Sequence, residues 1–387
     1  MVSSRALGIA ALFGLFAALP LSASEPFDFG FGQGMAPIPY EGAPPPGRCE
    51  PCHAEITADW SASRHHVAWT NDLMIAGFVA EPLEFCVNCH APLPEQRAEV
   101  LANQAFYRSL DPRRRNGPIP AQLPEPTAAH GIHCATCHLR GDVTLAPSKS
   151  DASPHDTRVE PGMSAGDFCV SCHEFPMPVT HAGVTTLSDA PMQSTGTEWR
   201  AWVATVRESR SRRDEPGSPT AATVRESRSR RDEPGSPTAA TVPESCQDCH
   251  MPGGRHVFRG AHDREWLKTA VSVERSAGRL TLRSVGVGHH FPSGDLFRHV
   301  TVEIDRGTGW EVVDWIGRRF ERGADDVRRV ASDTSLRPGE PRQVEVPAAF
   351  ERWRLVYHYG SETDEKRGLL DPAQITFTLA EGSGRLQ

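Results

Sequence analysis

The sequence predicts two regions of different kinds: a mostly α-helical and loop domain over residues 49–262, then an antiparallel β-sandwich over residues 263–387. Three observations predict this division. The pattern Cys-x-x-Cys-His occurs five times between residues 49 and 250 and does not occur later. The chain has 33 glycines and 33 prolines, and only 38% of its residues are hydrophobic. Beyond residue 263, apolar and polar residues begin to alternate, which is typical of half-buried β-strands.

The N-terminus has the features of an exported protein. Arg5 precedes an apolar stretch over residues 6–21, and the small residues Ser22, Ala23 and Ser24 follow it. This order is typical of a cleaved signal peptide, so we predict one over residues 1–24. An uncleaved membrane anchor is the alternative, although the stretch is short for a bilayer span. Residues 25–48 are rich in Gly and Pro and are predicted to form an extended lead-in.

The five motifs contain all ten cysteines of the chain. Their paired thiols are Cys49 and Cys52, Cys86 and Cys89, Cys134 and Cys137, Cys169 and Cys172, and Cys246 and Cys249, followed by His53, His90, His138, His173 and His250. This is the attachment signature of c-type haem, in which two thiols bind the porphyrin and the adjacent imidazole ligates the iron. Zinc ribbons, redox disulfides and structural disulfides also use paired cysteines, but none needs a histidine after every second one. We therefore predict five covalently bound haem c groups and a multihaem cytochrome.

Each iron needs a second axial ligand, and histidines are the obvious source. The chain has 17, and subtracting the five of the motifs leaves twelve. The positions that we predict as ligands are His65, His155, His256, His262 and His289. The alternatives are His66, His130, His133 and His181. Two imidazoles on every iron would leave no position for a substrate.

Those positions follow from local context. His65 lies in a predicted helix near residues 56–68, and His155 lies in a loop between the third and fourth motifs. His256 and His262 follow directly after the fifth motif. His289 lies in the loop Gly288–Asp295, which leaves the first predicted strand and can point back at the first domain.

The modest aliphatic content agrees with haem, because its apolar surface can replace part of an ordinary hydrophobic core. The formal net charge of −8 argues against a nucleic-acid partner and favours basic redox proteins as partners. A membrane-associated electron donor also fits an exported chain. No segment after residue 24 is apolar enough to cross a membrane.

The sequence also predicts the structure of two further segments of the first domain. Residues 95–110 predict a polar helix. Residues 204–221 are repeated without change in residues 222–239, and a third copy begins at Ala240. The repeat is rich in Arg, Ser, Pro and Glu and has almost no apolar residues, so we predict a disordered insert over residues 204–240.

The second domain is predicted from alternation. A short helix near residues 263–272 precedes strands over residues 279–285, 300–304, 310–313, 343–346, 353–357 and 375–379. Turn-forming residues separate these strands, which favours antiparallel pairing in a sandwich.

Beyond the motifs, longer strings make the chain resemble the multihaem cytochrome c-554 family over about residues 45–310. These strings are Trp60-x-x-Ser63-x-His65, the run from Cys246 to His262, and Gly288-His289-His290-Phe291-Pro292-Ser293-Gly294. The resemblance implies haems stacked in close pairs, two histidines on most irons and a role in moving electrons. By position, His65 matches the family's helical ligand and His289 matches its Gly-His-x-Phe-Pro element. The duplicated tract and a fifth haem motif, where the namesake has four, depart from the family pattern.

Three functions remain open on this basis. We favour an exported electron carrier in which electrons hop from haem to haem. The second is an oxidoreductase with one open iron that acts on a small nitrogen compound or a peroxide. The third is a subunit of an extracellular cytochrome filament or other homo-oligomer, in which a histidine of one chain ligates the haem of its neighbour.

Overall fold

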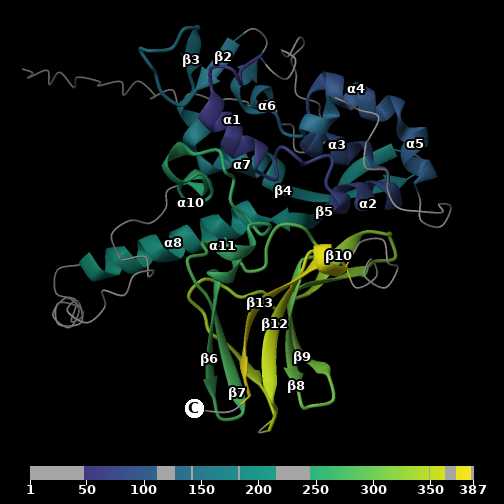
Figure 1. Cartoon of the computed structure of the whole chain (residues 1–387), viewed down its shortest axis with the longest axis vertical. Coiled ribbons are helices and arrows are strands. Elements are labelled where there is room, and N and C mark those ends of the chain that lie inside the picture. Colours follow the sequence, from purple (N-terminus) through teal and green to yellow (C-terminus); the bar gives the residue numbers. More distant parts are fainter. Residues whose placement is uncertain are drawn as a thin grey trace, which may run out of the picture.

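The computed structural model describes residues 48–110, 127–140, 143–181, 184–214, 245–347, 349–361 and 372–384. The predicted signal peptide and nearly all of the predicted lead-in lie outside these residues and stay predictions. Short helices gather at one end of the molecule and long strands at the other, with α8 (Thr195–Asp214) and α11 (Arg264–Lys268) between them (Figure 1). None of the described helices is both long and apolar enough to cross a membrane.

The first region is built from short helices and small sheets. Its described helices are α1 (Ala54–Ser61), α2 (Asp72–Ala80), α3 (Glu84–His90), α4 (Pro94–Ala102), α5 (Gln104–Ser109), α6 (Cys134–His138), α7 (Gly166–His173), α8 (Thr195–Asp214) and α10 (Cys246–His250). α11 (Arg264–Lys268) begins the second region, where a short helix was predicted near residues 263–272. Single 3-10 turns are η1 (Ala128–His130), η2 (Pro161–Ser164) and η4 (Pro252–Gly254). The polar helix predicted near residues 95–110 is present as α4 and α5.

Local signals explain where several of these helices start. The side chain of Asn71 accepts a hydrogen bond of 3.0 Å from the backbone N–H of Met74 and caps α2. Proline occupies the first position of α4, where its missing N–H is not needed. Gln96 of α4 accepts from the backbone N–H of Leu93 at 3.0 Å and donates to Gly131 O at 2.9 Å. This fully buried amide therefore ties α4 to the segment before the third motif.

The second region consists of two antiparallel sheets. One has the strand order β10-β9-β8-β12-β13, and the other has the order β11-β7-β6. Their strands are β6 (Val271–Ser276), β7 (Arg279–Ser284), β8 (His299–Asp305), β9 (Trp310–Arg322), β10 (Arg328–Asp333), β11 (Arg342–Glu345), β12 (Arg352–His358) and β13 (Thr376–Ser383). All six predicted strands occur, whereas β6 and β10 were not predicted.

Both sheets of this region contribute to one apolar core. Leu280 and Leu282 of β7 pack with Val302 of β8 and Leu355 of β12. Every residue of β8 is buried, because this strand lies in the middle of the larger sheet. Helices and several antiparallel sheets are thus present, while the strict division into a haem-packed domain and a β-sandwich stays a prediction.

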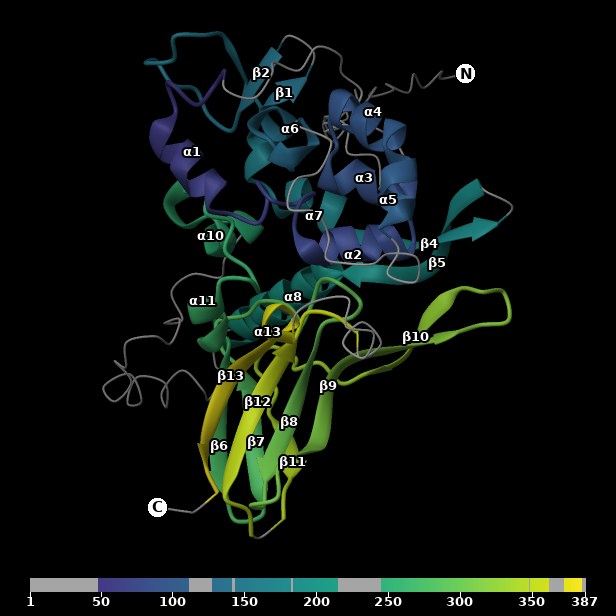
Figure 2. The same ribbon diagram turned by 45° about the vertical axis from the view of Figure 1, so that its right-hand side comes forward.

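A long hairpin in the first region was not predicted. β4 (Glu174–His181) pairs with β5 (Val184–Ser194) in antiparallel fashion. It projects on the same side as the β9–β10 hairpin (Figure 2), and the two meet where Arg329 approaches Asp189 at 3.4 Å. The remaining small sheet consists of β1 (Leu139–Arg140), β2 (Val143–Ala146) and β3 (Thr157–Val159).

Part of the predicted disordered insert is helical. α8 continues from Thr195 to Asp214 and so includes the first eleven residues of the first repeat, 204–214. Arg, Glu and Ser are compatible with a helix that is already nucleated by the residues before it, and the disorder of the insert stays a prediction. The rest of the insert lies outside the described residues.

Candidate functional site

The five Cys-x-x-Cys-His motifs meet around one cavity. Its volume is about 4090 Å³, several times the roughly 300–1,000 Å³ of a site for one small molecule. All ten cysteines and all five motif histidines line it. The fold therefore gathers motifs that are spread from residue 49 to residue 250.

Four of the motifs form short helices. The second lies in α3, the third is α6, the fourth ends α7 and the fifth is α10. Residues i, i+3 and i+4 share one face of a helix, so both sulfur atoms and the imidazole of a motif point the same way. In the first motif, the N–H groups of Cys52 and His53 donate to Cys49 O at 3.2 and 3.1 Å. This turn leads directly into α1 and gives the same spacing.

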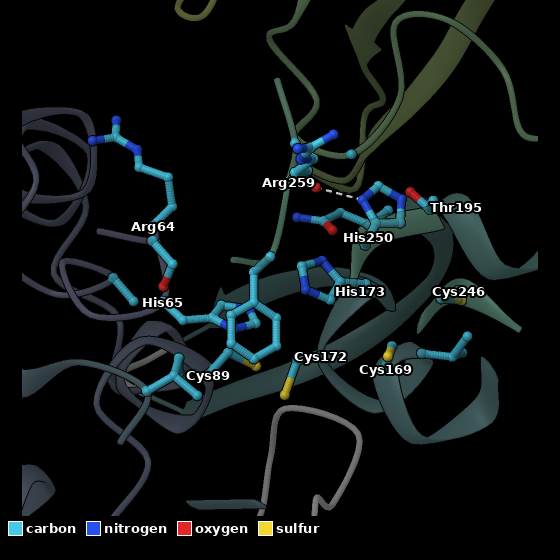
Figure 3. A pocket seen from close by; sticks show the side chains of 18 of the residues that line it. Arg64, His65, Cys89, Cys169, Cys172, His173, Thr195, Cys246, His250 and Arg259 are labelled. Carbon is cyan, nitrogen blue, oxygen red and sulfur yellow. Dashed lines mark hydrogen bonds between the residues drawn. The ribbon is translucent and has the colours of Figure 1, made fainter. Parts of the chain in front are cut away.

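Backbone carbonyls orient three of the motif imidazoles. His90 Nδ1 donates to Ala68 O at 2.9 Å, and His138 Nδ1 donates to Leu145 O at 2.9 Å. His250 Nδ1 donates to the carbonyl of Arg259 (Figure 3). Because a carbonyl only accepts, each Nδ1 carries the proton and each Nε2 is left to bind a metal.

Four motif imidazoles each face one imidazole from elsewhere in the chain. The ring centres are 6.4 Å apart for His53 and His155, 6.1 Å for His138 and His256, 6.3 Å for His173 and His65, and 6.3 Å for His250 and His289. A metal–imidazole bond is about 2 Å long and the ring centre lies about 1.1 Å beyond the nitrogen, so two imidazoles on opposite sides of one metal ion have centres about 6 Å apart. The four separations match that arrangement.

Burial keeps the innermost pair neutral, as metal ligands must be. Burial, together with the neighbouring imidazoles, lowers the pKa of His65 to about 3 and that of His173 to about 4. Figure 3 shows these two rings facing each other beside Cys89 and Cys172. Both imidazoles can therefore offer a lone pair at neutral pH.

The structure does not bring His262 to a motif imidazole. Its ring stacks on Tyr359, with centres 4.5 Å apart, and its Nδ1 lies 3.0 Å from Arg64 Nη2. In the sequence, His256 and His262 both follow shortly after the fifth motif, so their spacing predicts a ligand role for both. Only His256 lies opposite a motif histidine, because the chain turns toward the β region before reaching His262.

The alternative ligands lie elsewhere. His66, His130 and His133 gather around Trp60, with His130 6.0 Å from His66 and 6.1 Å from His133 between ring centres. No motif histidine belongs to this group within the described residues. His181 is exposed at the end of β4.

His90 of the second motif differs from the other four. Among the residues that the structure describes, no aromatic or imidazole ring contacts it, whereas each of the other motif histidines faces a second histidine. Burial lowers the pKa of His90, and the hydrogen bond to Ala68 O and the charge of Asp295 partly offset this effect. The second motif therefore provides one axial imidazole and no visible second one.

Sulfur atoms of different motifs lie against one another. Cys172 and Cys89 are in hydrogen-bonding contact, and so are Cys169 and Cys246. The Cys137 thiol also interacts electrostatically with Cys172. The fourth motif thus adjoins the second, third and fifth motifs. The first motif adjoins the third. Burial raises the pKa of the Cys134 thiol, and the charge of the Cys49 thiolate is close enough to raise it further.

Burial argues against redox disulfides at these cysteines. It raises the pKa values of Cys86, Cys134 and Cys137 to about 12, whereas disulfide exchange needs thiolates. Glu50, His133 and Cys134 form the one described group of three possible metal ligands, with their atoms within 4.8 Å of one another. A structural zinc needs four such ligands.

The loop that carries His289 is held by α8. Glu198 is only 8% exposed and accepts hydrogen bonds from Ser293 Oγ at 2.6 Å and from the backbone N–H of the residue after His289 at 3.2 Å. One turn later on α8, the Trp202 ring packs on Gly288, where a Cβ would lie 2.8 Å from the ring. The first region therefore sets the position of a histidine that the second region supplies.

Sequence reasoning missed these supporting residues. A lone Glu198 or Trp202 on a helix has no distinctive pattern. Gly131 was missed as well: it has a φ of +53°, and a Cβ there would lie 2.4 Å from His65 O. Only a glycine allows the chain before the third motif to pass so close to the backbone of His65.

Comparison with known proteins gives one match. No family model matches the chain, and no curated protein matches it. The structure is similar to the crystal structure of a penta-heme cytochrome c552 from Thermochromatium tepidum, with a TM-score of 0.54 and 17% sequence identity. The match covers 87% of this chain and 97% of that chain.

At this identity the likeness shows the fold. The chain has the fold of a multihaem c-type cytochrome, so that part of the prediction is confirmed. The match does not single out the cytochrome c-554 family.

Proposed function

We propose that this chain is an exported pentahaem c-type cytochrome that carries electrons between redox partners. One observation supports the proposal most. Five motifs line a single cavity, and four of their imidazoles face a second imidazole at 6.1–6.4 Å. An iron held by two imidazoles has no position for a substrate, which suits electron transfer better than substrate conversion.

The described residues fit haem c. The cysteine pairs would form the thioether bonds, and the motif histidines would be the proximal ligands. The second ligands would be His155, His256, His65 and His289 for the first, third, fourth and fifth motifs. Haem bound in this way supplies a one-electron couple whose potential depends on axial ligands, burial and nearby charge.

The contacts between motifs support a branched order of transfer. Cys172 of the fourth motif adjoins both Cys89 and Cys137, and Cys169 adjoins Cys246. In the proposal, electrons pass between the first and third motifs and reach the fourth. From the fourth motif they continue to the second or to the fifth.

Export and partners belong to the same proposal. Residues 1–24 have the pattern of a signal peptide, and c-type haem is attached outside the bacterial cytoplasm. We therefore propose a periplasmic or extracellular location. The net charge of −8 suits basic redox partners, including a membrane-associated electron donor.

Haem counting and electron paramagnetic resonance test the proposal. The chain is expressed with a c-type maturation system, and haem is measured per chain by the pyridine haemochrome assay. We expect five haems and mainly low-spin signals. The signals should also differ from one another, because the paired ring planes meet at angles from 10° to 60°. Colourless protein, or zinc in place of haem, would overturn the proposal.

A second candidate function rests on the second motif. Within the described residues, His90 has no second imidazole opposite it, so its iron can be open. An open iron would bind and convert a small molecule, such as a nitrogen oxide, hydroxylamine or a peroxide, with the other four haems supplying electrons.

Carbon monoxide separates this candidate from a simple carrier. If the iron at His90 is open, about one haem in five should be high-spin and should bind carbon monoxide after reduction. Five low-spin haems and no carbon monoxide binding would leave only the carrier. If a second chain supplies the missing ligand, as in a filament, the high-spin fraction should increase on dilution.

A further inference from the structure

Five polar side chains form a cluster where the first region meets the β region. We call Arg64, His262, Arg298, Tyr357 and Tyr359 the junction cluster. All five line the cavity that holds the motifs. Tyr357 and Tyr359 are 1% and 5% exposed, Arg298 and His262 are half-buried, and Arg64 is exposed at the rim. The cluster thus reaches from the solvent edge to a buried floor.

Hydrogen bonds fix the protonation of His262. Arg64 Nη2 lies 3.0 Å from His262 Nδ1, and because a guanidinium only donates, Nδ1 must be the acceptor. The imidazole is therefore neutral and carries its proton on Nε2. Tyr359 stacks on the ring and donates its own hydroxyl to Ala261 O at 2.7 Å, which holds the pair in place. Within the described residues, the Nε2–H of His262 has no acceptor.

Within the described residues, no carboxylate pairs directly with the arginines of the cluster, and the charges of Asp72 and Asp295 act on it from a longer distance. Among the described residues, neither Arg64 nor Arg298 has a carboxylate within 4.0 Å. Asp295, one turn before Arg298, uses Oδ1 to accept from the Phe297 N–H at 3.0 Å. Burial lowers the pKa of His262 to about 2, with the positive charges of Arg298 and Arg64 as the next causes. A half-buried guanidinium that has only neutral hydrogen-bond partners is costly, so this wall of the cavity favours a further negative group.

The donors also converge. Arg298 Nη1 donates to Ser293 O at 3.4 Å, and the guanidinium lies close enough to the buried phenol of Tyr357 to affect its pKa. Asp295 interacts electrostatically with both Tyr357 and His90, so the cluster adjoins the second motif. Two guanidinium groups, an imidazole N–H and a phenol together offer the donors that bind carboxylates and oxoanions.

We propose that the junction cluster binds an anion of the carboxylate or oxoanion class. Two sources share this chemistry: the propionate carboxylate of a haem at the adjoining motif, and a small inorganic oxoanion that enters from solvent. The first source rests on the proposed haem content, and the second does not. Neither depends on whether the iron at His90 is open.

The test uses the haem-loaded protein and compares Arg298→Gln with Arg298→Lys. Arg64→Gln is the second variant, because this exposed side chain can be changed without a folding defect. Arg279→Gln is the matched control, since Arg279 pairs with Glu345 on the surface, outside the cavity. Haem content and circular dichroism are measured first, so that a failure to bind haem is recognised separately.

Two measurements then distinguish the sources. Calorimetric titration with sodium nitrite and with sodium sulfate tests the free anion: we expect saturable binding that is roughly tenfold or more weaker in Arg298→Gln and Arg64→Gln. It should be largely retained in Arg298→Lys and unchanged in Arg279→Gln. Spectroelectrochemistry without added anion tests the propionate: loss of the guanidinium should lower the potential of one haem, because an unscreened carboxylate favours ferric iron. The proposal is overturned if neither anion binds and no haem potential moves more in the two cluster variants than in the control.

Discussion

The two regions of the molecule are stabilised in different ways. In the β region, Leu280, Leu282, Val302 and Leu355 form part of one protein core that runs through both sheets. In the first region, short helices surround a cavity of about 4090 Å³. A protein interior is normally packed without such voids, so the first region depends on what fills the cavity. The difference teaches that the β region is stabilised by its own apolar side chains, whereas the first region, under the proposed function, folds around haem.

The largest effect should come from removing a haem at the fourth motif. Cys169→Ser combined with Cys172→Ser should lose one haem and destabilise the first region by more than about 5 kcal/mol, because haem is larger than any side chain. Amide hydrogen exchange should then become fast in α7 and α10, while β8 and β12 stay protected.

The first motif supplies the control. Cys49→Ser with Cys52→Ser also removes one haem, but from a motif whose thiols, among the described residues, interact with the third motif, so the loss of protection should be confined to α1 and its surroundings. Equal loss of protection in β8 and β12 would mean that the two regions unfold as one unit.

A smaller effect is expected when two glycines are compared, one from each region. At Gly131 a Cβ would lie 2.4 Å from His65 O, so Gly131→Ala should displace this backbone and cost about 3 kcal/mol or more. At Gly278, with a φ of +69°, the nearest atom would lie 3.8 Å away, and only the backbone strain of about 1–2 kcal/mol should appear. Urea unfolding measures both changes.

The haem spectrum sharpens this comparison. Gly131→Ala should also convert part of the haem at His173 to high-spin, because its second ligand moves, whereas Gly278→Ala should leave every haem low-spin or unchanged. Identical spectra for the two variants would show that His65 is not held through Gly131.

The smallest effect concerns the contact between the regions. Glu198→Gln keeps the shape of the side chain but weakens the hydrogen bonds to the loop of His289, which should cost about 1–3 kcal/mol. The signal of the haem at His250 should change, as measured by electron paramagnetic resonance. Glu345→Gln, in an exposed ion pair, should cost less than about 1 kcal/mol and leave the spectrum as it was. If the two variants behave alike, α8 does not position His289.

The alternation of apolar and polar residues made most of the strands in the β region predictable. The strand expected over residues 353–357 is β12 (Arg352–His358), and the others also begin within a few residues of their predicted starts. The β4–β5 hairpin was missed because Pro176, Pro178 and Pro191 interrupt it, and proline within a run normally argues against a strand. Such a hairpin forms only because residues distant in sequence pack against it.

The candidate site was predictable in its chemistry but not in its geometry. The spacing of cysteine and histidine identifies what each motif can hold, since that depends on one turn of chain. Which histidine faces which motif depends on contacts between distant segments, such as His65 with His173. For the same reason, His262 and His256 could not be told apart in sequence, and the lack of a second imidazole opposite His90 within the described residues had no local signal.

The position of α8 has a consequence for the history of the duplicated tract. The residues that hold the loop of His289, Glu198 and Trp202, lie in the first two turns of this helix, and the repeat starts immediately afterwards, at residue 204. Replication slippage could therefore add or remove whole copies of eighteen residues without moving an iron ligand. A change in the number of copies would leave the position of His289 as it is, which explains how an unchanged duplicate can persist next to residues that hold a candidate iron ligand.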